Sequence, residues 1–243
     1  MSLVDEFMAE YDDAKRKRLE VNFGHAAAGV VFTDIETAYI DESVKIGAGT
    51  KIGPNVELVG ETVIGRDCKI LQGTRIENST VGDETKVDHS VVLDSKIGNN
   101  TAVGPFAYLR PNSIIGDDVK VGDFVEIKNS NISHGTKISH LTYVGDSDLG
   151  ENINVGCGVV FVNYDGKDKH RSTVGDGSFI GCNTNIISPV TLEAGVYVAA
   201  GSTVTGDVPS GSLYVARAKP KLINGWVNKR GLLVNRIKKE NKE

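Results

Sequence analysis

Residues 97–127 read IGNNTAVGPFAYLRPNSIIGDDVKVGDFVEI, and this stretch decides the fold. An aliphatic residue stands at every sixth position, at Ile97, Val103, Leu109, Ile115, Val121 and Ile127. A helix buries residues three or four apart and a half-buried strand buries alternate residues, so a period of six fits neither element alone. It fits a short strand that buries two positions and is followed by a corner.

The same period extends in both directions from this stretch. With a few shorter steps, aliphatic residues recur at Ile40, Ile46, Ile52, Leu58, Ile64, Ile70, Ile76, Val81, Val87, Ile132, Ile138, Val144, Val174, Ile180, Ile186, Leu192, Val198 and Val204. Three strands with their corners form one coil of about 18 residues, and each coil can hydrogen-bond to the next. The sequence therefore predicts an all-β prism of hexapeptide repeats, with about nine coils between Ile40 and Val204. A β-sandwich of short strands is the alternative.

Five of the steps contain five residues instead of six: 76–81, 87–92, 92–97, 127–132 and 144–149. Each shortened step keeps a serine two places before the next aliphatic residue, at Ser79, Ser90, Ser95, Ser130 and Ser147. We therefore expect these steps to lose one corner residue while the small inward position is retained.

Three segments depart from the repeat and set the expected domain boundaries. Residues 1–39 include a charged, helix-compatible stretch and are predicted to form an N-terminal helical linker or cap. Residues 40–215 form the repeat domain, with a loop ejected at 161–173, where loops on a rigid scaffold tend to carry function. Residues 216–243 form a basic tail that suggests an anionic partner, with Arg217, Lys219, Lys221, Lys229, Arg230, Arg236, Lys238, Lys239 and Lys242.

Composition excludes several classes of protein. The net charge is −5, so the basic footprint of a general nucleic-acid-binding protein is absent. The sequence shows neither a membrane-spanning run nor a secretory leader. The three cysteines, Cys68, Cys157 and Cys182, are odd in number and form no CxxC motif, which argues against structural zinc and a disulfide framework. We predict a cytoplasmic protein.

His140 is the candidate general base. It lies two places after the inward Ile138, so it should point outward from a corner, and histidine titrates near neutral pH. A surface histidine without a role is the alternative. His134 occupies the equivalent position one repeat earlier. The two histidines could therefore belong to a metal site shared between subunits, as in prism-shaped carbonic anhydrases. No third histidine has a matching context, so we predict no metal.

Arg110 and Lys128 are candidate phosphate ligands. They are 18 residues apart and each follows an inward aliphatic residue, so they should stack on neighbouring coils. An arginine fork beside a lysine point charge suits a phosphate group. The alternative is a pair of surface cations that Asp117, Asp118 or Glu126 neutralises.

Several motifs together resemble one family over about residues 25–226. They are Arg110-Pro, Val125-Glu-Ile-Lys128, His140-Leu-Thr-Tyr-Val-Gly145, Asn154-Val-Gly, Asn163-Tyr-Asp-Gly166 and Ala199-Ala-Gly-Ser-Thr-Val204. They resemble the acetyltransferase half of the bifunctional bacterial enzyme that makes UDP-N-acetylglucosamine. The resemblance implies a left-handed parallel β-helix, a homotrimer with sites between subunits, and acetyl transfer from acetyl-CoA to glucosamine-1-phosphate. The product, N-acetylglucosamine-1-phosphate, would feed UDP-N-acetylglucosamine, peptidoglycan and lipopolysaccharide precursor synthesis.

The resemblance also implies a role for each matching residue. His140 would be the general base, and Asn163 would orient the histidine and the substrate. The sugar phosphate would be held by Arg110, Lys128 and Lys169, and the sugar by Tyr143 and Asn154. Acetyl-CoA would contact Cys157, Asn163, Tyr164, Cys182, Ala200 and Arg217, with help from Lys219 and Lys221.

Two departures from the family pattern stand out. Cys157 and Cys182 occupy positions that are usually Ala and Ser, so a thiol near the thioester could be oxidised or form a transient acyl-cysteine. Gly73-Thr-Arg75 lies within the repeat and lacks the strand–loop–helix context of a nucleotide loop, so we predict no uridylyltransferase activity in this chain.

Three other functions compete with this hypothesis. The chain could be a hexapeptide acyltransferase for another amino or hydroxyl acceptor, a non-catalytic trimeric scaffold, or a metal-dependent hydratase. The flat aliphatic faces of a prism need to be covered, and this also favours a closed trimer.

Overall fold

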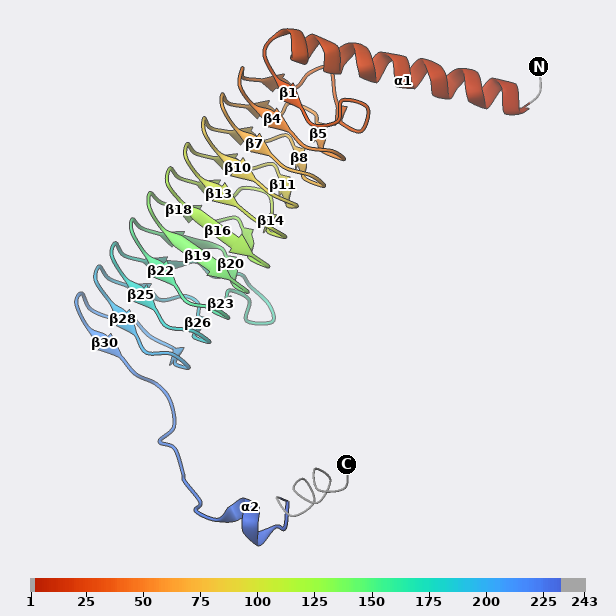
Figure 1. The fold of residues 1–243 in the computed structure, drawn as a ribbon. Coiled ribbons are helices and arrows are strands. Elements are labelled where there is room, and N and C mark those ends of the chain that lie inside the picture. The colour runs from red at the N-terminus through yellow and green to blue at the C-terminus, as the bar shows by residue number, and fades with distance from the viewer. Residues whose placement is uncertain (1–2, 233–243) are drawn as a thin grey trace.

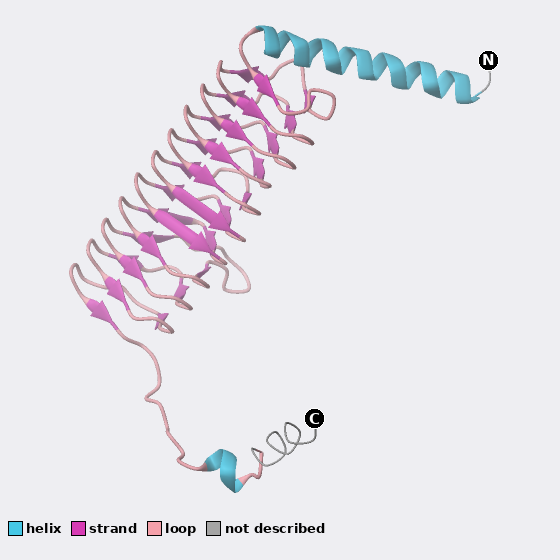
Figure 2. Ribbon diagram, in the orientation of Figure 1, coloured by secondary structure: helices cyan, strands magenta, loops and turns pink. Residues whose placement is uncertain are grey.

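The computed structural model describes residues 3–232, and Figure 1 shows most of them in one stack of coils, with a helix at one end and an extended segment at the other. Strands from successive coils pair in parallel and build three long faces, here called faces 1, 2 and 3. The architecture is a left-handed parallel β-helix of about ten turns, which confirms the predicted fold with one more coil than expected. In Figure 2, both helices of the described residues lie outside the stack, one across its N-terminal end and one on the segment that follows the last coil.

Short strands supply all three faces. Face 1 contains β1 Val31–Phe32, β4 Lys51–Ile52, β7 Lys69–Ile70, β10 Lys86–Val87, β13 Ala102–Val103, β16 Lys120–Asp123, β19 Lys137–His140, β22 Asn154–Val155, β25 Phe179–Ile180, β28 Tyr197–Val198 and β30 Leu213–Tyr214. Face 2 contains β2 Tyr39–Ile40, β5 Glu57–Val59, β8 Arg75–Glu77, β11 Val91–Leu93, β14 Tyr108–Leu109, β17 Glu126–Lys128, β20 Tyr143–Gly145, β23 Val160–Val162, β26 Asn185–Ile187 and β29 Thr203–Val204. Face 3 contains β3 Lys45–Ile46, β6 Val63–Ile64, β9 Thr80–Val81, β12 Lys96–Ile97, β15 Ile114–Ile115, β18 Asn131–Ile132, β21 Ser147–Leu149, β24 Ser172–Val174 and β27 Thr191–Leu192.

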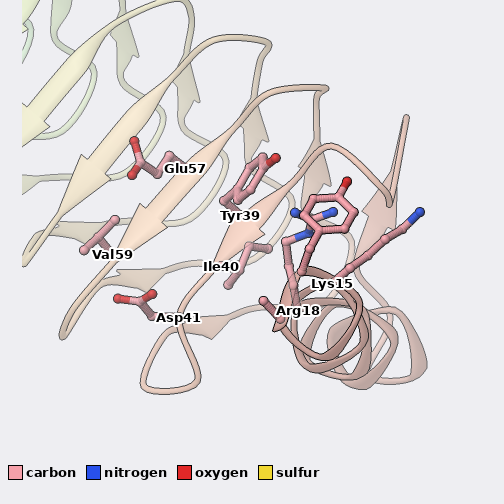
Figure 3. Close-up of a pocket in the computed structure, with 9 residues that line it drawn as sticks. Lys15, Arg18, Tyr39, Ile40, Asp41, Glu57 and Val59 are labelled. Carbon is pink, nitrogen blue, oxygen red and sulfur yellow. The ribbon is translucent and has the colours of Figure 1, made fainter. Parts of the chain in front are cut away.

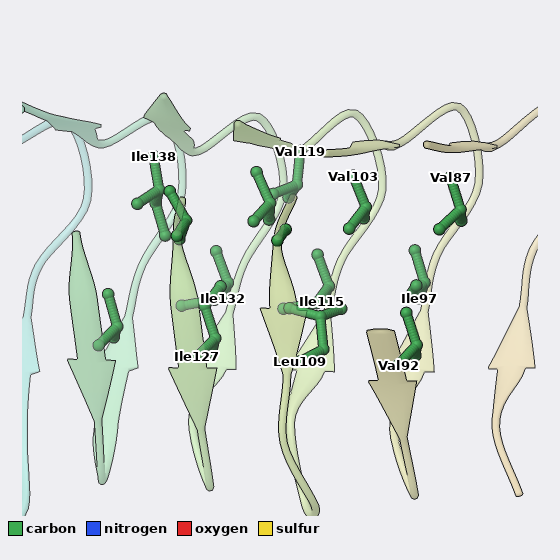
Figure 4. Packing of buried hydrophobic residues seen from close by; sticks show 14 of the residues in the cluster. Val87, Val92, Ile97, Val103, Leu109, Ile115, Val119, Ile127, Ile132 and Ile138 are labelled. Atoms are coloured by element: carbon green, nitrogen blue, oxygen red, sulfur yellow. The ribbon is translucent and has the colours of Figure 1, made fainter. Parts of the chain in front are cut away.

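The core is the row of aliphatic side chains that the period predicted. Ile97, Val103, Leu109 and Ile115 are all at most 3% exposed, and Figure 4 shows such residues pointing into the prism from successive coils. Ile46, near the N-terminal end of the stack, is only half-buried. Because each coil covers the next, the apolar surface is continuous along the axis, and aliphatic side chains fill nearly all of it, with Phe161 as a buried aromatic exception.

The corners are held by buried hydroxyl groups. Each of the five serines in the shortened steps is buried, as predicted. The Ser79 hydroxyl donates to the Glu77 carbonyl and accepts from the Ser95 N–H of the next coil at 3.0 Å. Thr85 accepts from the Thr101 N–H in the same way. A buried backbone N–H without a partner is strongly unfavourable, so these hydroxyls satisfy groups that the strands leave unpaired.

Helix α1, Leu3–Ala27, lies across the N-terminal end of the stack (Figure 1). Its C-terminal part is anchored by the buried Asn22, whose amide donates to the Ile35 and Ala38 carbonyls at 2.9 and 3.0 Å. Arg18 stacks on the Tyr39 ring at 4.4 Å. Neither described helix has the length and apolar composition needed to cross a bilayer.

The structure moves two of the expected limits. The coils begin at Val31, because β1 pairs with β4 before the six-residue period becomes regular. The ejected loop is 163–171 rather than 161–173, because Phe161 fills an inward position in β23 and Ser172 begins β24. The division into three domains stays a prediction.

The C-terminal segment leaves the stack after β30 and carries a short helix, α2, Trp226–Lys229 (Figure 1). Lys219 and Lys221 are exposed on this segment. The predicted tail residues Arg236, Lys238, Lys239 and Lys242 lie outside the described residues.

Two neighbouring residues of β15 test the inward positions. Ile115 is 2% exposed and Ile114 is 49% exposed. We expect Ile115→Ala to lower the free energy of unfolding by about 3 kcal/mol, or the melting temperature by ~6–12 °C, because it leaves a cavity between coils. Ile114→Ala should change stability by less than ~0.5 kcal/mol. Thermal unfolding followed by circular dichroism measures both, and equal shifts would contradict the assignment of inward positions.

Candidate active site

His140 lies at the corner between faces 1 and 2, at the end of β19. Its side chain is 54% exposed, and its Nδ1 lies 2.5 Å from Oδ1 of Asp123 on the preceding coil. The hydrogen bond from His140 holds the pKa of the Asp123 carboxyl below its ordinary value. The structure therefore presents the imidazole outward, as predicted, with one nitrogen already engaged.

Residues at this corner form one column along successive coils, here called the histidine column. Its order is Asp123, His140, Cys157, Cys182 and Ala200, as the strand register and the coil-to-coil hydrogen bonds require. Cys157 is half-buried, Cys182 is exposed, and both are free thiols. Arg217 reaches the end of the column and donates to the Ala200 carbonyl at 2.9 Å. The column thus gathers His140 with four of the residues expected to contact the coenzyme.

A second cluster lies at the corner between faces 2 and 3, centred on the carboxylate of Asp146. The Lys128 ammonium lies 3.0 Å from both Asp146 oxygens, and Asn129 Nδ2 lies 2.6 Å from Oδ1. Asn163 donates its amide to Oδ2. The Asp146 and Lys128 side chains are only 7% and 17% exposed. Burial raises the pKa of Asp146, but the hydrogen bonds from Asn129, Lys128 and Asn163 outweigh it and lower the pKa overall.

Face 2 between the two corners carries Tyr143, one of the two predicted sugar ligands. A Cβ added to Gly145 would lie 2.4 Å from the Tyr143 hydroxyl and 2.8 Å from Asn163 Nδ2. The ends of the Tyr143 and Asn163 side chains therefore both lie over Gly145 in β20, and a larger residue there would displace them. Arg110 follows β14 next to Lys128, as predicted, and pairs with Glu126 at 2.8 Å.

The ejected loop 163–171 is fastened near both of its ends. Asn163 binds Asp146 at the start, and Arg171 at the other end pairs with Asp148 and donates to the Asn129 carbonyl at 2.8 Å. Tyr164 and Lys169 form an antiparallel bridge and are exposed. The loop therefore projects Lys169 outward from a fixed base.

The structure brings the expected residues into two groups rather than one. His140, Cys157, Cys182, Ala200 and Arg217 lie along the histidine column, and Arg110, Lys128, Tyr143 and Asn163 lie across face 2. Asn154 is exposed in β22, one coil after Lys137. The Asn163 side chain binds Asp146 and not His140, whose hydrogen-bond partner is Asp123. The roles of all these residues stay predictions.

Two acidic residues of the site escaped the sequence analysis. Asp123 stands 17 residues before His140, and Asp146 stands 18 residues after Lys128. Those separations are one coil, so counting repeat positions from each candidate residue would have found both.

Comparisons with known proteins agree with this geometry. A family model of the GMPPB C-terminal domain matches residues 35–123, and a model of the bacterial transferase hexapeptide (six repeats) matches residues 171–206. The bifunctional protein GlmU of Clostridium beijerinckii is 53% identical over 225 residues, which are 93% of this chain and 49% of that protein. The chain is therefore similar to the C-terminal portion of this GlmU protein.

A second GlmU relative matches over a similar length. The GlmU of Alkaliphilus oremlandii is 54% identical over 228 residues, or 94% of this chain and 50% of that protein. The chain therefore spans about half the length of the curated GlmU relatives it matches. Among solved structures, LpxA from Acinetobacter baumannii is 20% identical, with 83% of this chain and 77% of that chain covered and a TM-score of 0.37.

One cavity lies at the N-terminal end of the stack, away from the histidine column and the Asp146 cluster. It measures about 490 Å³ and lies between α1 and the first strands of face 2, beside Lys15, Arg18, Tyr39 and Glu57 (Figure 3). No group of three or more His, Cys, Asp or Glu among residues 3–232 is arranged to hold a metal. His134 pairs with Asp118 at a different corner, between faces 3 and 1.

Asp146→Ala tests the second cluster. Removing a buried carboxylate leaves Lys128 unpaired, and we expect a loss of about 3–5 kcal/mol in the free energy of unfolding near neutral pH. The pKa of Asp146 is lowered by folding, so its contribution is present above the unfolded value of ~3.9 and disappears as the pH falls through the folded value. Chemical denaturation at neutral and acidic pH measures the difference.

Glu57→Ala is the matched control, because Glu57 pairs with Arg75 across coils on the same face but is 43% exposed. It should cost less than ~1 kcal/mol. Similar losses of unfolding free energy in the two variants would show that Asp146 stabilises the fold no more than an exposed ion pair does.

Proposed function

We propose that this chain is a glucosamine-1-phosphate N-acetyltransferase that uses acetyl-CoA. The observation that carries the proposal is the exposed His140, with its Nδ1 bonded to Asp123, on a scaffold that matches half of GlmU at 53% identity. An imidazole with one nitrogen engaged and the other open to solvent is arranged to accept a proton.

The chemistry begins with the sugar ammonium, which has no lone pair. Nε2 of His140 takes one proton from the nitrogen, and the freed amine attacks the thioester carbonyl. The tetrahedral intermediate breaks its C–S bond and expels CoA as a thiolate, and the nitrogen gives up a second proton, which protonates that thiolate. His140 then releases the first proton to solvent. The products are the N-acetylated sugar phosphate and CoA. No metal enters these steps, and the rate gain would come from the positioned base and from holding the reactants together.

The sugar phosphate is assigned to Arg110, Lys128 and Lys169. Arg110 and Lys128 lie on neighbouring coils, and Lys169 projects from the anchored loop. Arg110 pairs with Glu126 and Lys128 pairs with Asp146. A bound phosphate would therefore interact with two cations that already have carboxylate partners. Tyr143 and Asn154 would contact the sugar.

Acetyl-CoA is assigned to the histidine column, where Cys157, Cys182 and Ala200 follow His140 coil by coil. Asn163, Tyr164 and Arg217 would complete its contacts. We infer a homotrimer with sites between subunits, because His140, Cys182 and Arg217 are exposed in one chain. Cytoplasmic location and the absence of uridylyltransferase activity in this chain belong to the same proposal.

Release of CoA thiol tests the reaction and its acceptor together. We expect rapid release from acetyl-CoA with glucosamine-1-phosphate. With plain glucosamine we expect kcat/KM to be at least ~10-fold lower, because the charge-assisted contacts to the phosphate are lost. Equal rates would keep an acyltransferase but remove this substrate. No release with either acceptor would favour the scaffold hypothesis.

His140→Ala tests the base. We expect kcat to fall by ~10²–10⁴-fold, the usual contribution of a general base. His134→Ala is the matched control, because His134 is also an exposed histidine paired with an aspartate but lies at another corner. Its kcat should stay within about twofold. A loss below about threefold in His140→Ala would exclude His140 from proton transfer.

A further inference from the structure

The pairing of His140 with Asp123 is built into the backbone. The strands β16 and β19 each contain four residues, and their ladder continues to the pair Asp123 and His140. The other described strands contain only two or three residues. The extra length fixes the register of this pair, and the Leu141 N–H also donates to the Asp123 carbonyl at 3.0 Å.

Gly122 shows how closely the two coils approach beside this pair. A Cβ at Gly122 would lie 1.9 Å from the Ser139 carbonyl oxygen, which no real side chain tolerates. Glycine is therefore required immediately before Asp123, and it brings the carboxylate within reach of the ring. The contact between Asp123 and His140 is a consequence of strand geometry and not only of side-chain rotation.

The chemistry of this contact determines where the imidazole carries its proton. A carboxylate has no proton to give, so Nδ1 must donate, and the neutral ring then has a lone pair on Nε2. When Nε2 accepts a proton, the nearby negative charge stabilises the imidazolium. The lowered pKa of Asp123 is consistent with a carboxylate that stays ionised in this pair.

We propose that Asp123 is the positioning residue for His140: it fixes the ring and holds the neutral Nδ1–H tautomer, so that Nε2 faces the substrate as the base. The effect on turnover rests on the proposed acetyl transfer, whereas the tautomer does not. Asp123 faces the ring from the preceding coil and Cys157 follows it on the next coil. Lys120, on the same strand as Asp123, is the nearby cation that also lowers the pKa of Asp123.

The experiment combines NMR of ¹⁵N-labelled histidine with steady-state kinetics. In the unaltered chain at high pH, we expect His140 to show the Nδ1–H form, with the signal assigned by its loss in His140→Gln. Asp123→Ala should shift the ring toward Nε2–H and lower kcat by ~10–100-fold, with the KM for acetyl-CoA changed less than about twofold. Asp123→Glu should keep Nδ1–H, because its carboxylate can only accept, and should recover part of the loss.

Asp118→Ala is the matched control, because Asp118 pairs with His134 at 3.3 Å outside the site. It should leave both the His140 tautomer and kcat unchanged. The inference is overturned if Asp123→Ala keeps the Nδ1–H form, or if its kcat equals that of the unaltered chain. If the unaltered chain transfers no acetyl group, the proposed function fails, and the NMR result alone decides whether Asp123 sets the tautomer.

Discussion

Backbone hydrogen bonding between successive coils is the interaction on which everything else in this molecule depends. It sets neighbouring coils at the spacing of strands in a sheet and places each residue above the residue of the same repeat position. Side chains at a corner therefore form columns. One column carries Asp123, His140, Cys157 and Cys182, and another places Asn129, Asp146 and Asn163 in contact. Residues 17 or 18 apart in the sequence become nearest neighbours in space.

The corners decide how such a stack remains stable. A corner interrupts the strand ladder and would leave N–H groups buried, but hydroxyls such as Ser79 and Thr85 accept from the coil that follows. Asp146 extends the same principle to a carboxylate, which collects three donors at a shortened corner. Polar groups inside this protein are thus part of the interaction between coils. Lys128, which is proposed to bind phosphate, also pairs with Asp146, one of these groups.

Much of the fold could be predicted because the aliphatic residues that define the period in the sequence are the residues that the fold buries. Ile97 through Ile127 are inward in the structure as in the pattern, and the serines of the shortened steps are buried. The first coil at Val31 was missed because residues 33–38 interrupt the period. Phe161 was assigned to the loop because an aromatic residue replaced the expected aliphatic one. The handedness came only from the family resemblance, since a period of six is the same for either hand.

Candidate residues could be chosen from motifs, but their partners depended on the exact register. Counting one coil from His140 leads to Asp123, and counting one coil from Lys128 leads to Asp146. The sequence could not show that Arg110 would pair with Glu126, an alternative it left open, or that Asn163 would turn toward Asp146, because side-chain rotamers are not encoded in a repeat.

Each coil contacts only the coils next to it, and this has an evolutionary consequence. Gain or loss of a whole coil near either end of the prism would leave the spacing of residues 110–200 intact, so such chains can drift in length without rebuilding their chemistry. Within that span a deleted coil would separate Asp123 from His140 or Lys128 from Asp146. Length polymorphism should therefore concentrate at the ends of the stack, while the middle keeps a fixed count of coils.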